Sequence, residues 1–257
     1  MEIPVKAALL AIVVSWCAYG QSAAPPEFEV ASVKPSMSLS ITRSGGPGTS
    51  DPGQFTCQGC VLRDLILRAY DIRWYQLIGP GWLNNTRFDV YAKVPKGATK
   101  EHFGLMLQDL LAKRFKLTAH QDRKEMAAYN LKIDKGGPKF KEWTDPPAPS
   151  AKRTNPPVSG MGPAPDGGVI RRMLFPMDQV AVWLELMLLR PVFDETGLKG
   201  RYDITLHYFP ESASAGADLG PDLVEAVHSQ LGLKLEPVKR MIDVRMVDHV
   251  ERVPTGN

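Results

Sequence analysis

The feature that most constrains the fold of this chain is an internal repeat. The motif Arg87-Phe88-Asp89-Val90 recurs as Arg201-Tyr202-Asp203-Ile204, 114 positions later (201 − 87). On a strand, the aromatic residue of each motif would point to one face and its two charged neighbours to the other. Because similarity at a fixed spacing indicates a repeated structural unit, the sequence predicts two copies of one small domain.

The apolar residues around each motif follow the period of a helix. They recur three and four positions apart both before and after the motif, which predicts two amphipathic helices in each copy. Thr99 is placed to cap the helix that follows the first motif. The apolar positions are Leu62, Leu65, Ile66, Ala69 and Tyr70, then Leu107, Leu110, Leu111 and Phe115 in the first copy, and Val180, Trp183, Leu184, Met187 and Leu188, then Leu223, Ala226, Val227 and Leu231 in the second.

Two alternating stretches follow the second helix of each copy, and we predict that they form a hairpin. They are residues 115–119 and 127–133 in the first copy and 231–235 and 242–246 in the second. Two further strands are expected, at Phe28 to Val33 and at Val169 to Leu174. The sequence therefore predicts an α+β fold of two pseudo-symmetric repeats, each helix-strand-helix-strand-strand.

Proline and glycine mark the boundaries of the copies. Residues 136–168 carry eight prolines and predict an irregular linker, which leaves a first repeat at 21–135 and a second at 169–257. The glycine-rich stretch 44–53 predicts a mobile surface loop.

The first twenty residues have the pattern of a secretory signal peptide. Lys6 precedes an apolar run from Ala7 to Trp16, and small residues at Ala18 and Gly20 suit cleavage after Gly20. No later stretch is long and apolar enough to span a bilayer. We therefore expect an exported protein, periplasmic or extracellular, without an integral membrane segment once the signal is removed.

The charge distribution gives no indication of a nucleic-acid partner. The net charge is +3, with 31 basic residues scattered among 28 acidic ones, whereas a polyanion-binding surface needs clustered lysine and arginine. The partner is expected to be an envelope protein or a small ligand.

Cys57 and Cys60 are the only cysteine pair that remains after the predicted cleavage. In an oxidising compartment they can form a structural disulfide. The alternative is a redox dithiol, because two thiols at this spacing can stabilise one of them as a thiolate. The flanking sequence lacks the βαβ pattern of a thioredoxin-type site, which favours the structural role.

No motif in the sequence indicates a catalytic or metal site. The five histidines have no metal-ligand spacing, and neither Gly-x-Ser-x-Gly nor Ser-x-x-Lys occurs. We expect no cofactor, no metal and no catalytic residue that the sequence alone can identify.

Two sets of residues are candidates for ligand binding. The charges of the repeated motif, Arg87, Asp89, Arg201 and Asp203, could clamp a ligand in each half, although pairing on the sheet surface or holding a nearby turn is the favoured role. Three aromatic residues surround Gly79-Pro80-Gly81 and could line a groove or cover the edge of the core. They are Trp74, Tyr75 and Trp82.

Several segments together resemble a known family. The chain is similar to a large uncharacterised acidobacterial (Solibacter-type) family of exported proteins, a domain of unknown function. Some relatives are fused behind membrane metallopeptidases of the antibiotic-sensor type, which implies a sensing or docking role, and no catalytic residue can be transferred. The segments that carry the resemblance are Phe28 to Pro35, Leu62 to Tyr70, Arg87 to Val90, Asp194 to Asp203, Gln230 to Leu235 and Val247 to Arg252.

These observations favour an extracytoplasmic, non-enzymatic binding or interaction protein. Two alternatives remain open: a secreted enzyme, either a hydrolase or a thiol oxidoreductase, and a structural component of the cell envelope. A titratable cluster in a closed cleft would favour the enzyme, and a shallow groove between the two halves would favour binding.

Overall fold

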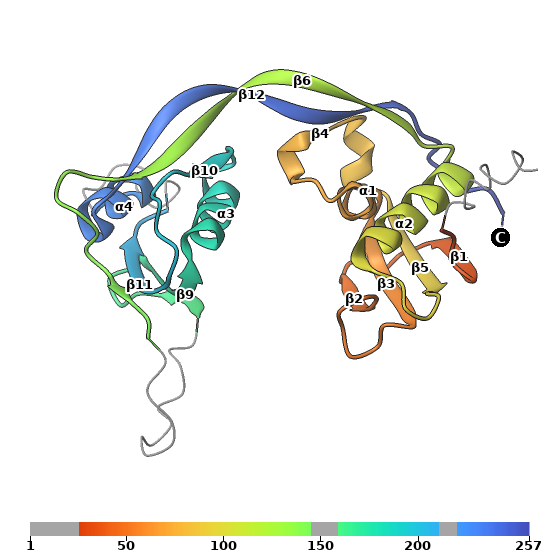
Figure 1. The fold of residues 1–257 in the computed structure, drawn as a ribbon, viewed down its shortest axis with the longest axis horizontal. Helices are drawn as coiled ribbons and strands as arrows, with labels where there is room; N and C mark the ends of the chain where they lie inside the picture. Colours follow the sequence, from red (N-terminus) through yellow and green to blue (C-terminus); the bar gives the residue numbers. More distant parts are fainter. Residues whose placement is uncertain (1–25, 145–158, 211–219, 257) are drawn as a thin grey trace, which may run out of the picture. The chain divides into compact units, whose positions relative to one another are not determined.

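The computed structural model describes residues 26–144, 159–210 and 220–256 (Figure 1). The predicted signal peptide, residues 1–20, and positions 145–158 of the predicted linker lie outside this range. The described residues form four α-helices and three four-stranded sheets, which confirms the α+β class. None of these helices combines the length and the hydropathy that crossing a membrane requires.

The helices are α1 (Leu62–Tyr70), α2 (Lys100–Phe115), α3 (Met177–Leu188) and α4 (Leu223–Leu231), with short 3-10 helices η1 (Trp74–Gln76) and η2 (Gly81–Asn84). The strands before α3 are β1 (Val30–Pro35), β2 (Thr42–Gly45), β3 (Gln54–Val61), β4 (Leu77–Ile78), β5 (Arg87–Lys93), β6 (Thr118–Ile133), β7 (Lys141–Glu142), β8 (Gly160–Pro163) and β9 (Val169–Pro176). The strands after α3 are β10 (Val192–Asp194), β11 (Arg201–Tyr208) and β12 (Leu233–His249).

The chain divides into two units. Unit 1 is Met1–Gln121 together with Arg245–Asn257, and unit 2 is Asp122–Val244. Both divisions fall inside long strands, β6 and β12, whereas the repeat boundaries predicted from the sequence follow the linker. The assignment of residues to two repeats stays a prediction.

Unit 1 is built on a sheet of order β1-β5-β3-β2, with α1 packed against α2. The helix positions predicted from apolar spacing face its core, and Thr99 caps α2 by accepting a hydrogen bond from the His102 N–H at 3.2 Å. The largest fully buried side chains of this core include Phe55, Leu62, Phe88, Leu107 and Phe115.

Unit 2 is built on a sheet of order β7-β11-β9-β8 with α3 and α4. Asp222 caps α4 by accepting from the Glu225 N–H at 2.8 Å. Its core includes Leu184, Ile204, Val227 and Leu233. At the end of α3 the helix prediction holds only in part, because Met187 is exposed although its spacing placed it on the buried face.

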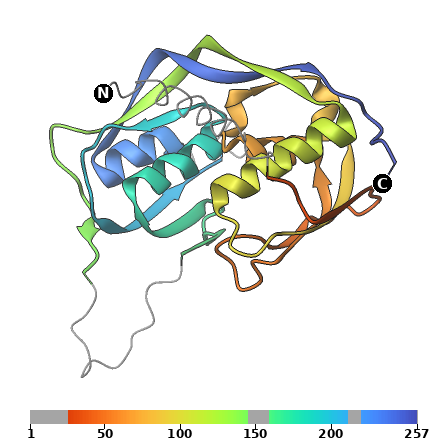
Figure 2. The same ribbon diagram turned by 45° about the vertical axis from the view of Figure 1, so that its right-hand side comes forward.

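The predicted hairpins are wrong: each pair of alternating stretches forms one long strand. β6 and β12 run side by side as a two-stranded ribbon (Figure 2). Residues 120–126, between the two stretches of β6, contain no glycine, proline or asparagine that would form a tight turn. In β12, Pro237 lies inside the strand. Proline is tolerated in a strand where its missing N–H is not required for a hydrogen bond to the neighbouring strand.

Two short strands that the sequence did not predict join this ribbon in parallel. β4 pairs with β12 at Leu77↔Arg245 and Ile78↔Met246, inside unit 1. β10 pairs with β6 at Val192↔Tyr129 to Asp194↔Leu131, inside unit 2. These pairs complete the third sheet, of order β10-β6-β12-β4.

The described ends of the predicted linker are not irregular. β7 pairs with β11, and β8 pairs with β9, so both add edge strands to the sheet of unit 2. The glycine-rich stretch 44–53 connects β2 and β3, which are antiparallel neighbours. The strands expected at residues 28–33 and 169–174 correspond to β1 and β9.

Candidate functional site

The charged pair of the first motif holds one glycine of the neighbouring strand. Phe88 points into the core, so Arg87 and Asp89 lie on the opposite face of β5. Asp89 Oδ1 accepts a hydrogen bond from the Gly59 N–H at 2.8 Å, and Arg87 Nη1 donates to the Gly59 carbonyl oxygen at 2.7 Å. The two charges therefore fix both backbone polar groups of a single residue.

Gly59 lies in a bulge of β3. The register between β3 and β5 shifts between Cys57 and Cys60, and these two cysteines are joined by a disulfide. Their exposed fractions are 1% and 0%, so the disulfide belongs to the core of unit 1. We call residues 57–60 with Arg87 and Asp89 the clamped bulge.

The clamped bulge supports the connection between β1 and β2, residues 36–41, which we call the crossing loop. β1 and β2 are the two edges of their sheet, so the loop has to cross the intervening β5 and β3. Gly59 has φ +64°, and a Cβ there would overlap the carbonyl oxygen of Ser40. The crossing is therefore possible only because this position has no side chain.

The crossing loop exposes three large apolar side chains. Met37, Leu39 and Ile41 are 99%, 86% and 46% exposed, and serines alternate with them. The Ser38 Oγ donates to the Ser40 carbonyl at 3.0 Å, and Gly59 lies against the backbone of both serines. This loop was not among the sites predicted from the sequence, although its signal is visible as the alternation Ser-Met-Ser-Leu-Ser-Ile.

The charged pair of the second motif has different contacts. Arg201 Nη2 donates to the Leu174 carbonyl oxygen at 3.2 Å, and Asp203 is paired in register with the same residue. The register of β9 with β11 continues without a shift from Arg201 to Tyr208, so there is no bulge to hold. Tyr202 is buried, and its hydroxyl accepts from the Gly200 N–H at 3.0 Å. The structure brings no second clamp together here.

The aromatic candidates lie on η1 and η2 of unit 1. The Trp74 and Tyr75 rings meet edge-on with centroids 5.7 Å apart, and Arg63 donates to the Trp74 carbonyl oxygen. Trp82 packs against the core, with the Arg252 guanidinium 5.9 Å from the centre of its ring. Covering the edge of the core therefore explains the placement of Trp82.

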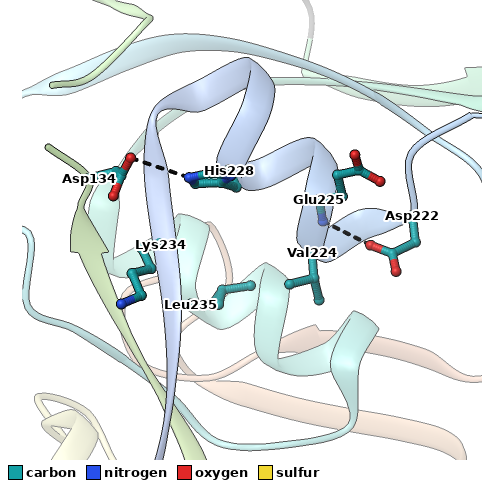
Figure 3. A pocket seen from close by; sticks show the side chains of 7 residues that line it. All are labelled: Asp134, Asp222, Val224, Glu225, His228, Lys234 and Leu235. Atoms are coloured by element: carbon teal, nitrogen blue, oxygen red, sulfur yellow. Dashed lines mark hydrogen bonds and ion pairs between the residues drawn. The ribbon is translucent and has the colours of Figure 1, made fainter. Parts of the chain in front are cut away.

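An open hollow of about 480 Å³ lies on unit 2, between α4 and the start of β12 (Figure 3). His228 Nε2 lies 3.2 Å from Asp134 Oδ2, and Asp222 is already used as the α4 cap. The N–H of Lys135 and, to a smaller extent, His228 hold the pKa of Asp134 below its ordinary value. The hollow is lined by Asp134, Asp222, Val224, Glu225, His228, Lys234 and Leu235.

The hollow on unit 2 is lined by more acidic than basic side chains. Its three carboxylates outnumber Lys234, but one of them caps a helix and another pairs with His228. Among the described residues, no group of three or more histidine, cysteine, aspartate and glutamate side chains is arranged to hold a metal ion. None of the residues predicted from the sequence as ligand-binding lines this hollow.

Comparison with known proteins identifies a family. The model of the family "Protein of unknown function (DUF3738)" matches residues 63–250, and the chain belongs to this family. No curated protein and no solved structure matches the chain. The predicted membership of a family of unknown function is thereby confirmed.

Proposed function

We propose that the chain is an exported, extracytoplasmic binding or interaction protein without catalytic activity, and that the crossing loop is its contact surface. The observation that carries this proposal is the near-complete exposure of Met37 and Leu39. Burying one such side chain is worth about 1.5–3 kcal/mol, so two of them exposed in one short loop forgo this stabilisation unless a partner covers them. Export and the acidobacterial origin that the resemblance implies are part of this proposal.

The support beneath the loop favours a binding role. Gly59 is held by two side-chain hydrogen bonds, by a disulfide across the bulge, and by contact with the serine backbone above it. A loop fixed before binding loses less conformational entropy when a partner covers it. The clamped bulge therefore presents the apolar side chains in a prepared arrangement, which suits a docking or sensing role.

A thiol oxidoreductase is disfavoured by the burial of both sulfur-bearing residues. Exchange requires an attacking thiolate to reach a disulfide sulfur, and Cys57 and Cys60 are covered by the core. Replacing both with serine should leave the fold intact, with a loss of about 2 kcal/mol for so short a closed loop. Rapid reduction of the native disulfide by a small thiol, at the rate of an exposed disulfide, would contradict this argument.

We also propose that the two units are copies of one ancestral unit. The order from β3 to β6 (strand, helix, short strand, strand, helix, long strand) recurs from β9 to β12. The sheets have corresponding orders, β1-β5-β3-β2 and β7-β11-β9-β8, with Phe88 and Tyr202 buried in corresponding strands. An experimental structure in which Phe88 and Tyr202 fail to superpose would refute the duplication.

The test of the binding surface is site-specific photo-crosslinking in the native cells. A photoreactive residue in place of Leu39 should give a discrete adduct in the exported fraction. The matched control is Leu189 at the end of α3, which is 72% exposed but lies in unit 2. If the two positions give the same adducts, or if neither gives one, the crossing loop is not the contact surface.

A further inference from the structure

Two arginine side chains lie near a single carboxylate beside the glycine-rich stretch of unit 1. Asp64 and Arg68 are four positions apart on α1, a spacing at which opposite charges pair along a helix. The Asp64 carboxylate instead forms an ion pair with Arg43 of β2. Within the part of the chain that the structure describes, no acidic side chain forms an ion pair with Arg68. Arg68 is therefore left without the partner that its own helix offers.

The guanidinium group of Arg68 is nevertheless fixed in position. Its central carbon lies 5.0 Å from the ring centre of Phe55 and 5.0 Å from that of Phe103, and both rings are buried. Gly46 packs against the same group, because a Cβ added there would lie 3.5 Å from Arg68 Nη2. Arg68 as a whole remains exposed to solvent. The fold thus presents a rigidly held cation beside the glycine-rich stretch.

The surroundings of Arg68 favour the binding of an anion. Burial and, after it, the nearby charge of Arg43 lower the pKa of Arg68. Both causes disfavour the charged guanidinium group, so a negatively charged group bound to it would stabilise that form. Carboxylates and phosphates suit this group best, because its planar fork of donors matches two of their oxygens.

Lys100, the first residue of α2, brings a second cation to the same stretch. It precedes Phe103 by three positions, so the two side chains are neighbours on the helix surface. Its Cε would lie 3.3 Å from a Cβ added to Gly48, two residues after the glycine that contacts Arg68. Arg68 and Lys100 therefore both contact residues 46–48.

The acidic residues next to these cations have other contacts. The carboxylate of Glu101 accepts hydrogen bonds from the Thr99 hydroxyl and from its own N–H, which lower its pKa, and the charge of Lys100 contributes least. Asp51 accepts the Gly46 N–H with its backbone carbonyl oxygen at 3.0 Å. Among the described residues, neither carboxylate forms an ion pair with Arg68 or Lys100. Both cations therefore keep hydrogen-bond donors for a ligand.

We propose that Arg68 and Lys100 bind the carboxylate or phosphate group of a small ligand, beside residues 46–48. The guanidinium group donates two parallel hydrogen bonds to two oxygens of that group, and the ammonium group adds a further donor. This inference goes beyond the proposed function and does not depend on the crossing loop, because its side chains belong to α1 and α2.

The first test follows the modification of Arg68 by phenylglyoxal, a reagent for guanidinium groups, and locates the product by mass spectrometry. Inorganic phosphate or acetate should slow this reaction relative to chloride at the same ionic strength, because the bound oxyanion covers the guanidinium group. Arg172, an exposed arginine on β9 of unit 2, is the control and should react at an unchanged rate. The unaltered protein is used, so the result does not depend on the folding of a variant.

The two anions distinguish the sources of the oxyanion. Protection of Arg68 by phosphate alone identifies a phosphoryl group, protection by acetate alone identifies a carboxylate, and protection by both identifies a site open to either. If neither anion slows the modification of Arg68, or if Arg172 is slowed equally, the proposed site is wrong.

The second test measures the binding of the protecting anion by isothermal titration calorimetry. Arg68→Gln should lower the association constant about 10- to 100-fold, because it removes charge-assisted hydrogen bonds, and Lys100→Gln should lower it by a smaller factor. Arg43→Gln should also weaken binding, since Asp64 is then free to pair with Arg68. Arg172→Gln, the same change of charge in unit 2, should leave it unchanged.

Unchanged binding by Arg68→Gln, in a variant whose thermal unfolding without the anion matches that of the parent, overturns the proposal. Photo-crosslinking at Leu39 tests the crossing loop and has no bearing on Arg68. The anion site and the proposed function can therefore fail separately.

Discussion

Truncating Phe88 to alanine is the sharpest test of how the first motif stabilises unit 1. Phe88, the second residue of β5, is 1% exposed, and its ring meets that of Phe115 edge-on with centroids 4.8 Å apart. Replacing a buried phenylalanine by alanine costs about 3–5 kcal/mol, of which the aromatic pair accounts for about 0.5–1.5 kcal/mol. The loss should be near the upper end, because strands on both sides of β5 prevent the site from collapsing.

The measurement is denaturant unfolding of the variant beside two controls on the same strand. Tyr91→Ala removes a similar ring from a position that is 39% exposed, and should cost about 1 kcal/mol or less. Arg87→Ala loses one hydrogen bond to Gly59, worth about 0.5–1.5 kcal/mol, or somewhat more because the donor is charged. A Phe88→Ala protein that unfolds within 1 kcal/mol of the parent would refute the argument that the motif's aromatic residue anchors the core.

Three further predictions concern the clamped bulge, the loss of folding stability at low pH, and export. Gly59→Ala should destabilise unit 1 by about 1–3 kcal/mol, because the added Cβ would overlap the crossing loop. The control Gly81→Ala should be nearly neutral, because a Cβ there has no neighbouring atom within 4 Å. Equal urea midpoints for the two variants would contradict this prediction. The backbone N–H of Lys135 holds the folded-state pKa of Asp134 below its ordinary value, so the stabilising effect of this carboxylate is complete above the ordinary value and is lost as the pH falls through the folded value. Asp134→Asn should therefore reduce stability at neutral pH but not in strong acid, and a difference that persists in strong acid counts against this prediction. Mass spectrometry of the exported protein should find Gln21 at the N-terminus, and an intact Met1 would exclude cleavage after Gly20.

The helices could be predicted from the sequence because their signal is local. Leu107, Leu110, Leu111 and Phe115 are all buried on α2, as their spacing requires, and Thr99 caps the helix. A period of 3.6 residues follows from helix geometry alone, so it can be recognised without knowing what the helix packs against. On strands the corresponding signal is alternation, which predicted that Phe88 and Tyr202 point inward and their charged neighbours to the opposite face.

The candidate surface could not be predicted in the same way, because its parts come from distant segments. Arg87 and Asp89 were correctly placed on one face of a strand, but both bind Gly59, which lies 28 and 30 residues earlier in the chain. The alternation in residues 36–41 also resembles an ordinary half-buried strand. It becomes an exposed loop only because β1 and β2 occupy opposite edges of the sheet, and local sequence does not encode strand order.

The long strands show why the hairpins predicted at the end of each repeat were wrong. The last strand of each predicted repeat does not turn back on itself but pairs with a short strand from the other repeat: β6 with β10, and β12 with β4. A hairpin within one repeat and an exchange between two repeats satisfy the same period of two, so alternation cannot distinguish them. Two- and three-residue strands such as β4 and β10 are also too short to have a period. This pairing explains why the compact units divide inside β6 and β12 rather than at the linker. Each unit contains part of the last strand of the other predicted repeat, so neither predicted repeat contains all the strands of one unit.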